Sequence, residues 1–321
     1  MKPIGFLFLL LLFVVGPWNV TNARSLGQSD SSCSILVGSL NRTYLLHFPN
    51  SPDHSGPFPL LLVLHGAGGT GRGMVRLTGA KFDTLADQDA FIVVYPDGIG
   101  KRWNDERSAD EARDRAHEKN IDDVGFIAHL IDFLVVHHNA DPNRVYVTGI
   151  SNGAIMSFRL ACELPDKIAA IAPVDGGIPV NGLSRCTPDK PVSVLAINGT
   201  KDPLVHWEGG EVTGPFGYKK LGRVLSPLQT VEFWVARDHC SLQADSTLLP
   251  DVDPDDGTRV TKYEYRDGKQ NSRVDLYAVR GGGHTWPGGE QYLPAWIVGK
   301  TSRDINACVI IWDFFRNQIR H

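Results

Sequence analysis

The chain has no excess of basic residues. Its 32 Lys and Arg are outnumbered by 36 Asp and Glu, which leaves a formal net charge of −4 at pH 7. Binding to nucleic acid or to anionic membranes depends on clustered positive charge, so neither is indicated as a partner. Internal repeats and domain linkers are also missing, and the length suits one large domain.

Cysteine is scarce. The five residues are Cys33, Cys162, Cys186, Cys240 and Cys308. They form no C-x-x-C pair and match no zinc-ligand spacing. In an oxidising compartment we expect one or two disulfides and at least one free thiol, since the number is odd. Cys162 and Cys308 lie on helical patterns and are expected as buried apolar side chains. The other three lie in loops or at helix ends, so two of them are the expected pair.

A single long apolar run occurs, at the N-terminus. It covers residues 4–15, is closed by Pro17, and is followed by small residues up to Ala23. A membrane-spanning helix needs about 20 apolar residues, so this shorter run is typical of a secretory signal peptide cut after Ala23. We expect a secreted protein, extracellular or periplasmic, with a signal peptide over 1–23, a flexible mature N-terminus over 24–40 and one folded domain over 41–321.

Short β-branched or apolar runs alternate with amphipathic helical patterns along that domain. The expected strands lie at 42–48, 59–65, 91–95, 144–148, 168–174, 192–197, 263–265 and 274–279, and the expected helices at 122–138, 154–163, 228–237 and 303–319. This alternation predicts an α/β fold, a mostly parallel sheet with helices on both faces.

Two stretches and one pair of acids stand outside this alternation. The charged segment 101–120 is expected as an exposed loop or a short solvated helix. Residues 207–227 are expected as a long surface loop, and whether it acts as a lid is left open. Asp122 and Asp123 are expected to cap the helix that they open.

Residues 149–153 read GISNG and fit the pattern G-x-S-x-G. They lie between an expected strand and an expected helix, which is the setting of the nucleophile elbow in α/β-hydrolases. Gly149 and Gly153 have no Cβ, so the strand and the helix can approach closely around a strained turn. The turn would lift the hydroxyl of Ser151 above the sheet, close to the positive end of the helix. We expect Ser151 to be a nucleophile.

A serine nucleophile needs a base, and the base needs a group that orients it. In α/β-hydrolases these groups follow the serine in the order acid, then histidine. Asp202 lies just past the expected strand 192–197, and His284 lies in the glycine-rich loop after 274–279. We expect Asp202 to orient His284, the general base. Asp175, which follows the strand before, is the alternative acid.

Attack on an ester produces an oxyanion, which needs backbone N–H donors. Asn152 would supply one donor, because it follows the nucleophile. Ala67 would supply the second from the glycine-rich loop 65–69, which His65 is expected to brace. The loop residues Trp103, Trp207 and Trp286 are expected near the cleft, where each could stack on a substrate or pack locally.

Several motifs together resemble one family. They are LLLVLHGAGG, FIVVYPDG, RWN at 102–104, DDVGFIAHLID, VYVTGISNGAIMS, NGTKDPLV, GGGHTWPGG and WDFF. As a set they are similar to the secreted α/β-hydrolase esterases that include polyhydroxybutyrate depolymerases, feruloyl esterases and acetylxylan esterases. The resemblance implies an α/β-hydrolase fold in a single domain. It also implies a triad of Ser151, Asp202 and His284 and an oxyanion hole at Ala67 and Asn152.

Two departures from the family lie where substrate specificity would be set. The charged segment after Trp103 is longer than the family leads us to expect. His206 and Trp207 stand where a Pro-Tyr pair is expected.

The residues and the resemblance together predict a serine esterase that forms an acyl-enzyme and needs no metal or organic cofactor. We expect feruloyl or acetyl esters of plant polysaccharide as substrates, with polyhydroxybutyrate as the alternative, because no Ser/Thr-rich linker or second substrate-binding domain is evident. A serine peptidase of the same fold and an inactive binding protein are the other classes considered. The sequence indicates no oligomeric state, and the use of the sequon at Asn41 is left open.

Overall fold

The computed structural model describes all residues except 1–30, 52–53, 108–115, 117–118, 216–219 and 321. The expected signal peptide and residues 24–30 lie outside the described part. Residues 31–40, expected to be flexible, instead form a β-hairpin with the next segment: β1 (Ser31–Val37) pairs antiparallel with β2 (Leu40–His47). Among the described residues, no helix is both long enough and apolar enough to cross a bilayer.

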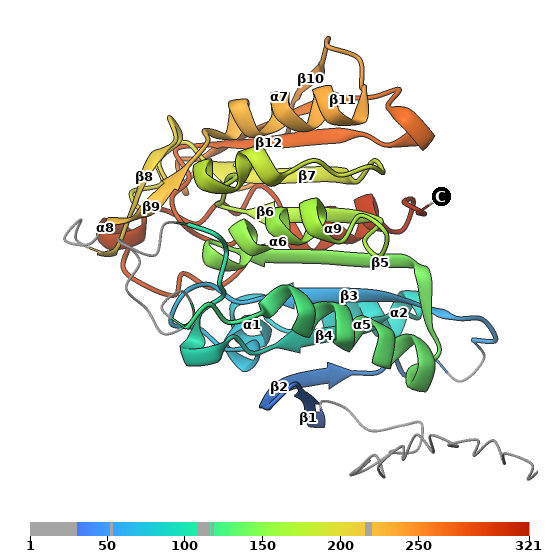
Figure 1. Cartoon of the computed structure of the whole chain (residues 1–321). Coiled ribbons are helices and arrows are strands. Elements are labelled where there is room, and N and C mark those ends of the chain that lie inside the picture. Colours follow the sequence, from blue (N-terminus) through green and yellow to red (C-terminus); the bar gives the residue numbers. More distant parts are fainter. Residues whose placement is uncertain (1–30, 52–53, 108–115, 117–118, 216–219, 321) are drawn as a thin grey trace, which may run out of the picture.

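A ten-stranded sheet forms the centre of the molecule (Figure 1), in the order β1-β2-β4-β3-β5-β6-β7-β12-β11-β10. The strands from β4 to β12 in this order run parallel, and antiparallel pairs extend both edges. Their bounds are β3 (Phe58–Leu64), β4 (Ile92–Pro96), β5 (Ala140–Ile150), β6 (Ala170–Val174), β7 (Ser193–Gly199), β10 (Asp245–Leu248), β11 (Arg259–Tyr265) and β12 (Val274–Arg280). Every residue of β3 and of β7 is buried. Their continuous apolar sequences follow from this burial on both faces.

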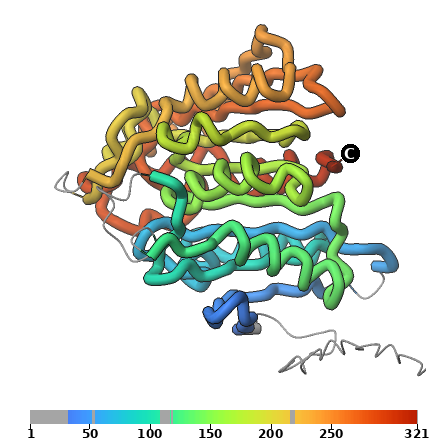
Figure 2. Tube along the Cα trace, in the orientation of Figure 1, coloured from blue at the N-terminus to red at the C-terminus, as the bar shows by residue number. Residues whose placement is uncertain are grey.

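Helices cover both faces of the sheet, as the alternating pattern predicts. Side chains from α5 (Asp123–His138), α6 (Asn152–Glu163) and α7 (Pro227–Asp238) pack on one face. Side chains from α1 (Gly71–Leu77), α2 (Lys81–Asp89) and α9 (Ala307–Phe315) pack on the other. The tube in Figure 2 shows the red C-terminal helix α9 returning to the middle of the sheet. There the ring of Phe315 stacks on Tyr146 of β5, with centroids 4.8 Å apart.

The remaining short elements lie in the loops. They are η1 (Ile99–Lys101), η2 (Val180–Arg185), η4 (Lys269–Asn271), α8 (Ala295–Val298) and the separate antiparallel pair β8 (Gly210–Thr213) and β9 (Lys220–Val224). The expected long surface loop over 207–227 therefore contains two strands. The last helix is shorter than the apolar stripe over 303–319 suggests.

The first part of the charged segment after Trp103 is not an exposed loop, although Lys119 and Asn120 near its end are exposed. Asn104, Asp105 and Arg107 are buried. The guanidinium of Arg107 pairs with the carboxylate of Asp105 at 2.8 Å. Since each buried charge has a partner, this part of the segment belongs to the folded core. Its residues 108–115 and 117–118 lie outside the described part.

Of the two acids expected to cap α5, one does so. Asp122 accepts a hydrogen bond from the amide of Gly125 at 2.8 Å. Asp123 is instead fully buried, and its carboxylate pairs with Arg42 at 2.6 Å and accepts the amide of Asn104 at 2.8 Å. Asp123 therefore holds the charged segment to the first strands.

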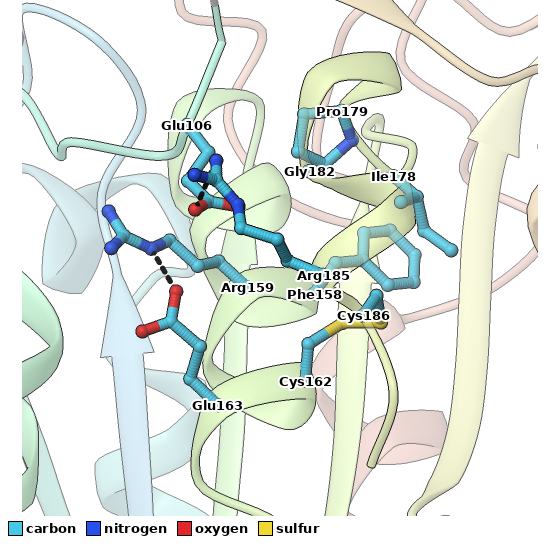
Figure 3. Close-up of a pocket in the computed structure, with 10 residues that line it drawn as sticks. All are labelled: Glu106, Phe158, Arg159, Cys162, Glu163, Ile178, Pro179, Gly182, Arg185 and Cys186. Carbon is cyan, nitrogen blue, oxygen red and sulfur yellow. Dashed lines mark hydrogen bonds and ion pairs between the residues drawn. A yellow bond between two sulfur atoms is a disulfide. The ribbon is translucent and has the colours of Figure 1, made fainter.

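The disulfide joins Cys162 of α6 to Cys186, which directly follows η2 (Figure 3). The expectation that Cys162 would be an unpaired apolar residue is wrong, and so is the expected pairing among Cys33, Cys186 and Cys240. Cys186 was one of the three candidates for a bond, but its partner comes from the helix that follows the elbow. Cys308 is free and buried, as expected.

We expect reduction of this disulfide to destabilise the protein. The bond closes a loop with a sequence separation of 24 residues. Loop-closure entropy of that size corresponds to about 3 kcal/mol. Thermal unfolding with and without dithiothreitol measures the effect. Cys162→Ser is the control, because reductant should no longer shift its unfolding temperature; an unshifted wild type would contradict the expectation.

A buried carboxyl group near the start of β7 leads to a prediction about how stability depends on pH. Asp238 is 1% exposed, accepts one amide hydrogen bond, from Val192 at 3.3 Å, and leaves Oδ2 without a partner. Burial raises its pKa to about 7 from 3.8. The folded state then binds more protons than the unfolded state between these two values, so this group's contribution to stability is present at low pH and is lost as the pH rises through 7.

Asp238→Asn should remove this loss of stability at high pH, because the asparagine side chain does not ionise. At about 1.4 kcal/mol for each pH unit, the variant gains at most about 4 kcal/mol over the wild type above pH 8. Near pH 4 the two proteins should unfold alike. Urea unfolding at both pH values tests this, and an equal difference at the two would contradict it.

Candidate active site

Ser151 occupies a strained turn between β5 and α6. Its backbone has φ 59° and ψ −120°, a region that costs a non-glycine residue about 1–3 kcal/mol. A Cβ at Gly149 would lie 2.6 Å from the carbonyl oxygen of Leu64, and one at Gly153 would lie 2.5 Å from the same oxygen. Both glycines are therefore needed for α6 to approach β3, which is the reason for the G-x-S-x-G pattern. The side chain of Ser151 remains half-buried.

The expected acid and base are in contact. Asp202 follows β7 and His284 follows β12, and these strands are parallel neighbours in the sheet. Oδ2 of Asp202 lies 2.7 Å from Nδ1 of His284. Its Oδ1 accepts the amides of Leu204 at 2.7 Å and Val205 at 2.9 Å. Since an ionised carboxylate only accepts hydrogen bonds, Nδ1 carries the proton and Nε2 is left as the basic nitrogen.

The same edge of the sheet carries the serine. β5, β7 and β12 all run in the same direction, so Ser151, Asp202 and His284 all follow the carboxyl ends of their strands. Charge on the imidazole is favoured there: burial lowers the pKa of His284, but Asp202 and then Asp175 outweigh it, so the pKa of His284 is raised.

The loop after β3 lies against the serine. A Cβ on Gly66 would come within 3.5 Å of the Cβ of Ser151. The amides of Ala67 and Asn152 donate no hydrogen bond within the described residues. Two N–H groups without a partner, one next to Ser151 in the chain and one in the loop against it, fit the pair of donors expected for an oxyanion.

His65 braces this loop. Nε2 accepts the amide of Gly98 at 2.9 Å, so Nδ1 carries the proton and donates to the carbonyl of Gly66 at 2.7 Å. This neutral tautomer agrees with the pKa of His65, which burial lowers.

The side chain of Asn152 has a function that the sequence did not indicate. Its Oδ1 accepts the amide of Trp103 at 2.8 Å, and its Nδ2 donates to the carbonyl of Trp103 at 3.0 Å and to Asp105 at 2.5 Å. These bonds hold the start of the charged segment against the elbow. The backbone amide of Asn152 takes no part in these bonds.

Two of the three tryptophans expected to contact a substrate do not reach the surface. Trp103 and Trp286 are completely buried. Their indole N–H groups donate to the carbonyl of His65 at 2.9 Å and to Sγ of Cys308 at 3.3 Å. Of the two alternatives, stacking on a substrate or packing locally, both rings therefore take the second, which corrects their assignment as substrate-binding residues. Trp207 is half-buried.

The residues after His284 that contact its backbone were not predicted from the sequence. The hydroxyl of Tyr292 donates to the carbonyl of His284 at 3.0 Å, and the amide of His284 donates to Val298 at 2.6 Å. On this segment Trp296 is 75% exposed. An aromatic side chain soon after the histidine loop was the available signal.

A group of three potential metal ligands in the described residues consists of Asp175, Asp202 and His284. All three side chains are buried. The carboxylate oxygens that could bind a metal already accept hydrogen bonds from backbone amides, or contact Nδ1 of His284. The arrangement fits the sharing of a proton better than the binding of a metal.

Known proteins are similar to this chain in sequence and in fold. A family model described as Esterase PHB depolymerase matches residues 43–187. NocK of Nocardia uniformis subsp. tsuyamanensis, provisionally named an esterase, is 32% identical over 287 residues, which cover 87% of this chain and 80% of NocK. Feruloyl esterase B of Piromyces equi is 27% identical over 257 residues, 76% of this chain and 42% of that protein.

Two further relatives extend the comparison. Poly(3-hydroxybutyrate) depolymerase of Ralstonia pickettii is 28% identical over 284 residues, 83% of this chain and 56% of that enzyme, so this chain spans about half the length of that relative and of the Piromyces esterase. The structure of acetyl xylan esterase from Aspergillus awamori matches with a TM-score of 0.54 at 17% identity, over 79% of this chain and 94% of that one, and has the same fold. The chain therefore belongs to the esterase family of the polyhydroxybutyrate depolymerases, whose members are carboxylic-ester hydrolases.

Proposed function

We propose that this protein is a secreted serine esterase in which Ser151 is the nucleophile, His284 the general base and Asp202 the group that orients the imidazole. The observation that carries the proposal is the 2.7 Å contact between Asp202 and His284 at the sheet edge where the strained elbow presents Ser151. The order of the three residues in the chain is that of the α/β-hydrolases.

The reaction follows from this arrangement. Nε2 of His284 takes the proton from Oγ of Ser151 as the oxygen attacks the ester carbonyl. The amides of Ala67 and Asn152 stabilise the oxyanion that forms. His284 then gives its proton to the leaving alcohol, and an acyl-enzyme remains. Water, deprotonated by the same nitrogen, releases the acid and restores the hydroxyl of Ser151.

Secretion is part of the proposal. The N-terminal apolar run supports it, because it is typical of a signal peptide. The disulfide between Cys162 and Cys186 supports it as well, because such bonds persist in oxidising compartments. Expression of the full-length chain, followed by mass determination of the protein in the medium, tests both export and cleavage after Ala23.

For the substrate, we propose feruloyl or acetyl esters of plant polysaccharide. The relatives named feruloyl esterase and acetylxylan esterase support this class. The exposed ring of Trp296, on the segment bonded to the backbone of His284, adds an aromatic surface suited to a sugar or a phenolic ring. The depolymerase relative makes a hydroxybutyrate polyester the second candidate.

Two measurements test the proposal. A fluorophosphonate probe should form one adduct, at Ser151, and an unlabelled serine would reject the nucleophile and favour an inactive binding protein. Product release from feruloylated xylan, methyl ferulate, acetylated xylan and a hydroxybutyrate oligomer, at equal ester concentration, ranks the substrates. Higher turnover of the oligomer would select the polyester, and cleavage of casein in place of all esters would select a peptidase.

A further inference from the structure

A second carboxyl group lies behind the acid and the base. Asp175 follows β6, and its backbone adopts φ 51°, in the left-handed region. Its amide donates to the carbonyl of Ile197 in β7 at 2.8 Å. The residue is 2% exposed. A strained backbone and a buried carboxyl group at the edge that bears the site call for a function.

The two oxygens of Asp175 connect the loops of the acid and the base. Oδ1 accepts the amide of Gly199 at 2.9 Å, at the start of the loop that leads to Asp202. Oδ2 accepts the amide of Thr285 at 2.8 Å, directly after His284. A single side chain therefore fixes the backbones that carry both partners of the 2.7 Å contact.

The carboxyl group also faces the charges of the site. The donor atoms of Asp175, Asp202 and His284 lie within 4.8 Å of one another. The titratable groups that face Asp175 are Asp202 from the loop after β7, His284 from the loop after β12, and Tyr292, which hydrogen-bonds the backbone of His284. Burial, and then the charge of Asp202, raise the pKa of Asp175 well above its usual range. Asp175 in turn favours the protonated imidazole of His284.

We propose that Asp175 is a positioning residue that fixes the acid loop to the base loop and, as a second negative charge beside the imidazole, sets the pH range in which His284 acts as a base. The positive charge of the protonated imidazole lowers the pKa of Asp175 and so favours its ionised form. The inference rests on the proposed function, since it assigns no new nucleophile or base. Asp202 alone bonds Nδ1, so Asp175 acts through its neighbours.

Asp175→Asn tests the charge. The variant keeps a side chain of the same shape and one acceptor oxygen, and it removes the negative charge. The acidic limb of kcat/KM against pH for p-nitrophenyl acetate reports the ionisation of the free base. We expect its midpoint to move to lower pH by about one unit or more, the size of shift that a charge about 4–6 Å away produces. Asp175→Ser, which is smaller and equally uncharged, should shift the limb in the same direction.

The matched control is Asp238→Asn. It also removes a buried carboxyl group whose pKa is raised, but at the opposite end of β7, so the limb should stay where it is in the wild type. An unmoved or alkaline-shifted limb in folded Asp175→Asn overturns the proposal. So does a loss of about 10⁴ in kcat, which would make Asp175 the orienting acid.

Further measurements separate the remaining outcomes. If neither variant folds, the carbon-13-labelled imidazole of His284 in the wild type decides: two inflections with pH are expected from two interacting groups, and one inflection overturns the proposal. Ser151→Ala separates the two levels of inference. Retained activity in that variant removes the proposed function, whereas an inactive Ser151→Ala with an unshifted Asp175→Asn removes only the function of Asp175.

Discussion

Ser151→Ala should lower kcat on p-nitrophenyl acetate by a factor of about 10⁴ or more. The hydroxyl oxygen at the strained elbow is the atom proposed to form the acyl-enzyme, and alanine has no nucleophilic atom to replace it. The substitution removes one oxygen and adds no bulk, so the fold and the substrate site should persist. Steady-state kinetics and a stoichiometric fluorophosphonate titration measure the loss.

Ser157→Ala is the matched control for this variant. Ser157 lies on the same helix, is buried, and donates its hydroxyl to the carbonyl of Gly153 at 2.8 Å. Its loss should cost about 1 kcal/mol of stability and leave kcat near that of the wild type. Near-normal turnover by Ser151→Ala would reject the nucleophile, while equal losses in both variants would point to a damaged helix.

Asp202→Asn should lower kcat by a factor of about 10⁴. The amide can donate to Nδ1, which favours the tautomer with its proton on Nε2. His284 then cannot accept the proton of Ser151. The two amides that now bond Oδ1, from Leu204 and Val205, should hold the loop in place, so the melting temperature should change much less than the rate.

The pH profile distinguishes this cause from simple disruption. Added activity should appear at alkaline pH, because hydroxide can replace the missing base in the variant. Asp238→Asn again serves as a comparison, since its buried carboxyl group is remote from His284 and its kcat should be unchanged. A kcat within tenfold of the wild type in Asp202→Asn would show that another group orients the imidazole, and Asp175 would be the first candidate.

The elbow and the contact between Asp202 and His284 could be predicted because their signals are local. Positions 149 and 153 require glycine, because the backbone of β3 leaves no room for a Cβ at either. Asp202 and His284 each follow an apolar strand, and parallel neighbours bring their carboxyl ends to one edge of the sheet. The parallel arrangement followed from strands alternating with helices.

Features that depend on which loop covers which helix could not be predicted. Trp103 and Trp286 lie in loops by sequence, yet tertiary packing buries both rings completely. The partner of Cys186 depends on where η2 lies over α6, and no spacing encodes this. Asp123 stands at a helix start, where capping is the usual expectation, but the long-range pair with Arg42 takes its carboxylate.

The hydrogen bonds between the side chain of Asn152 and the backbone of Trp103 have a consequence for how the substrate preference of this enzyme could change. The bonds from the amide side chain end at Trp103 and Asp105, so we expect changes beyond Arg107 to leave Asn152, a proposed oxyanion donor, in its place. Grafting a relative's segment after Arg107 should then change substrate preference while the activity of the proposed triad persists.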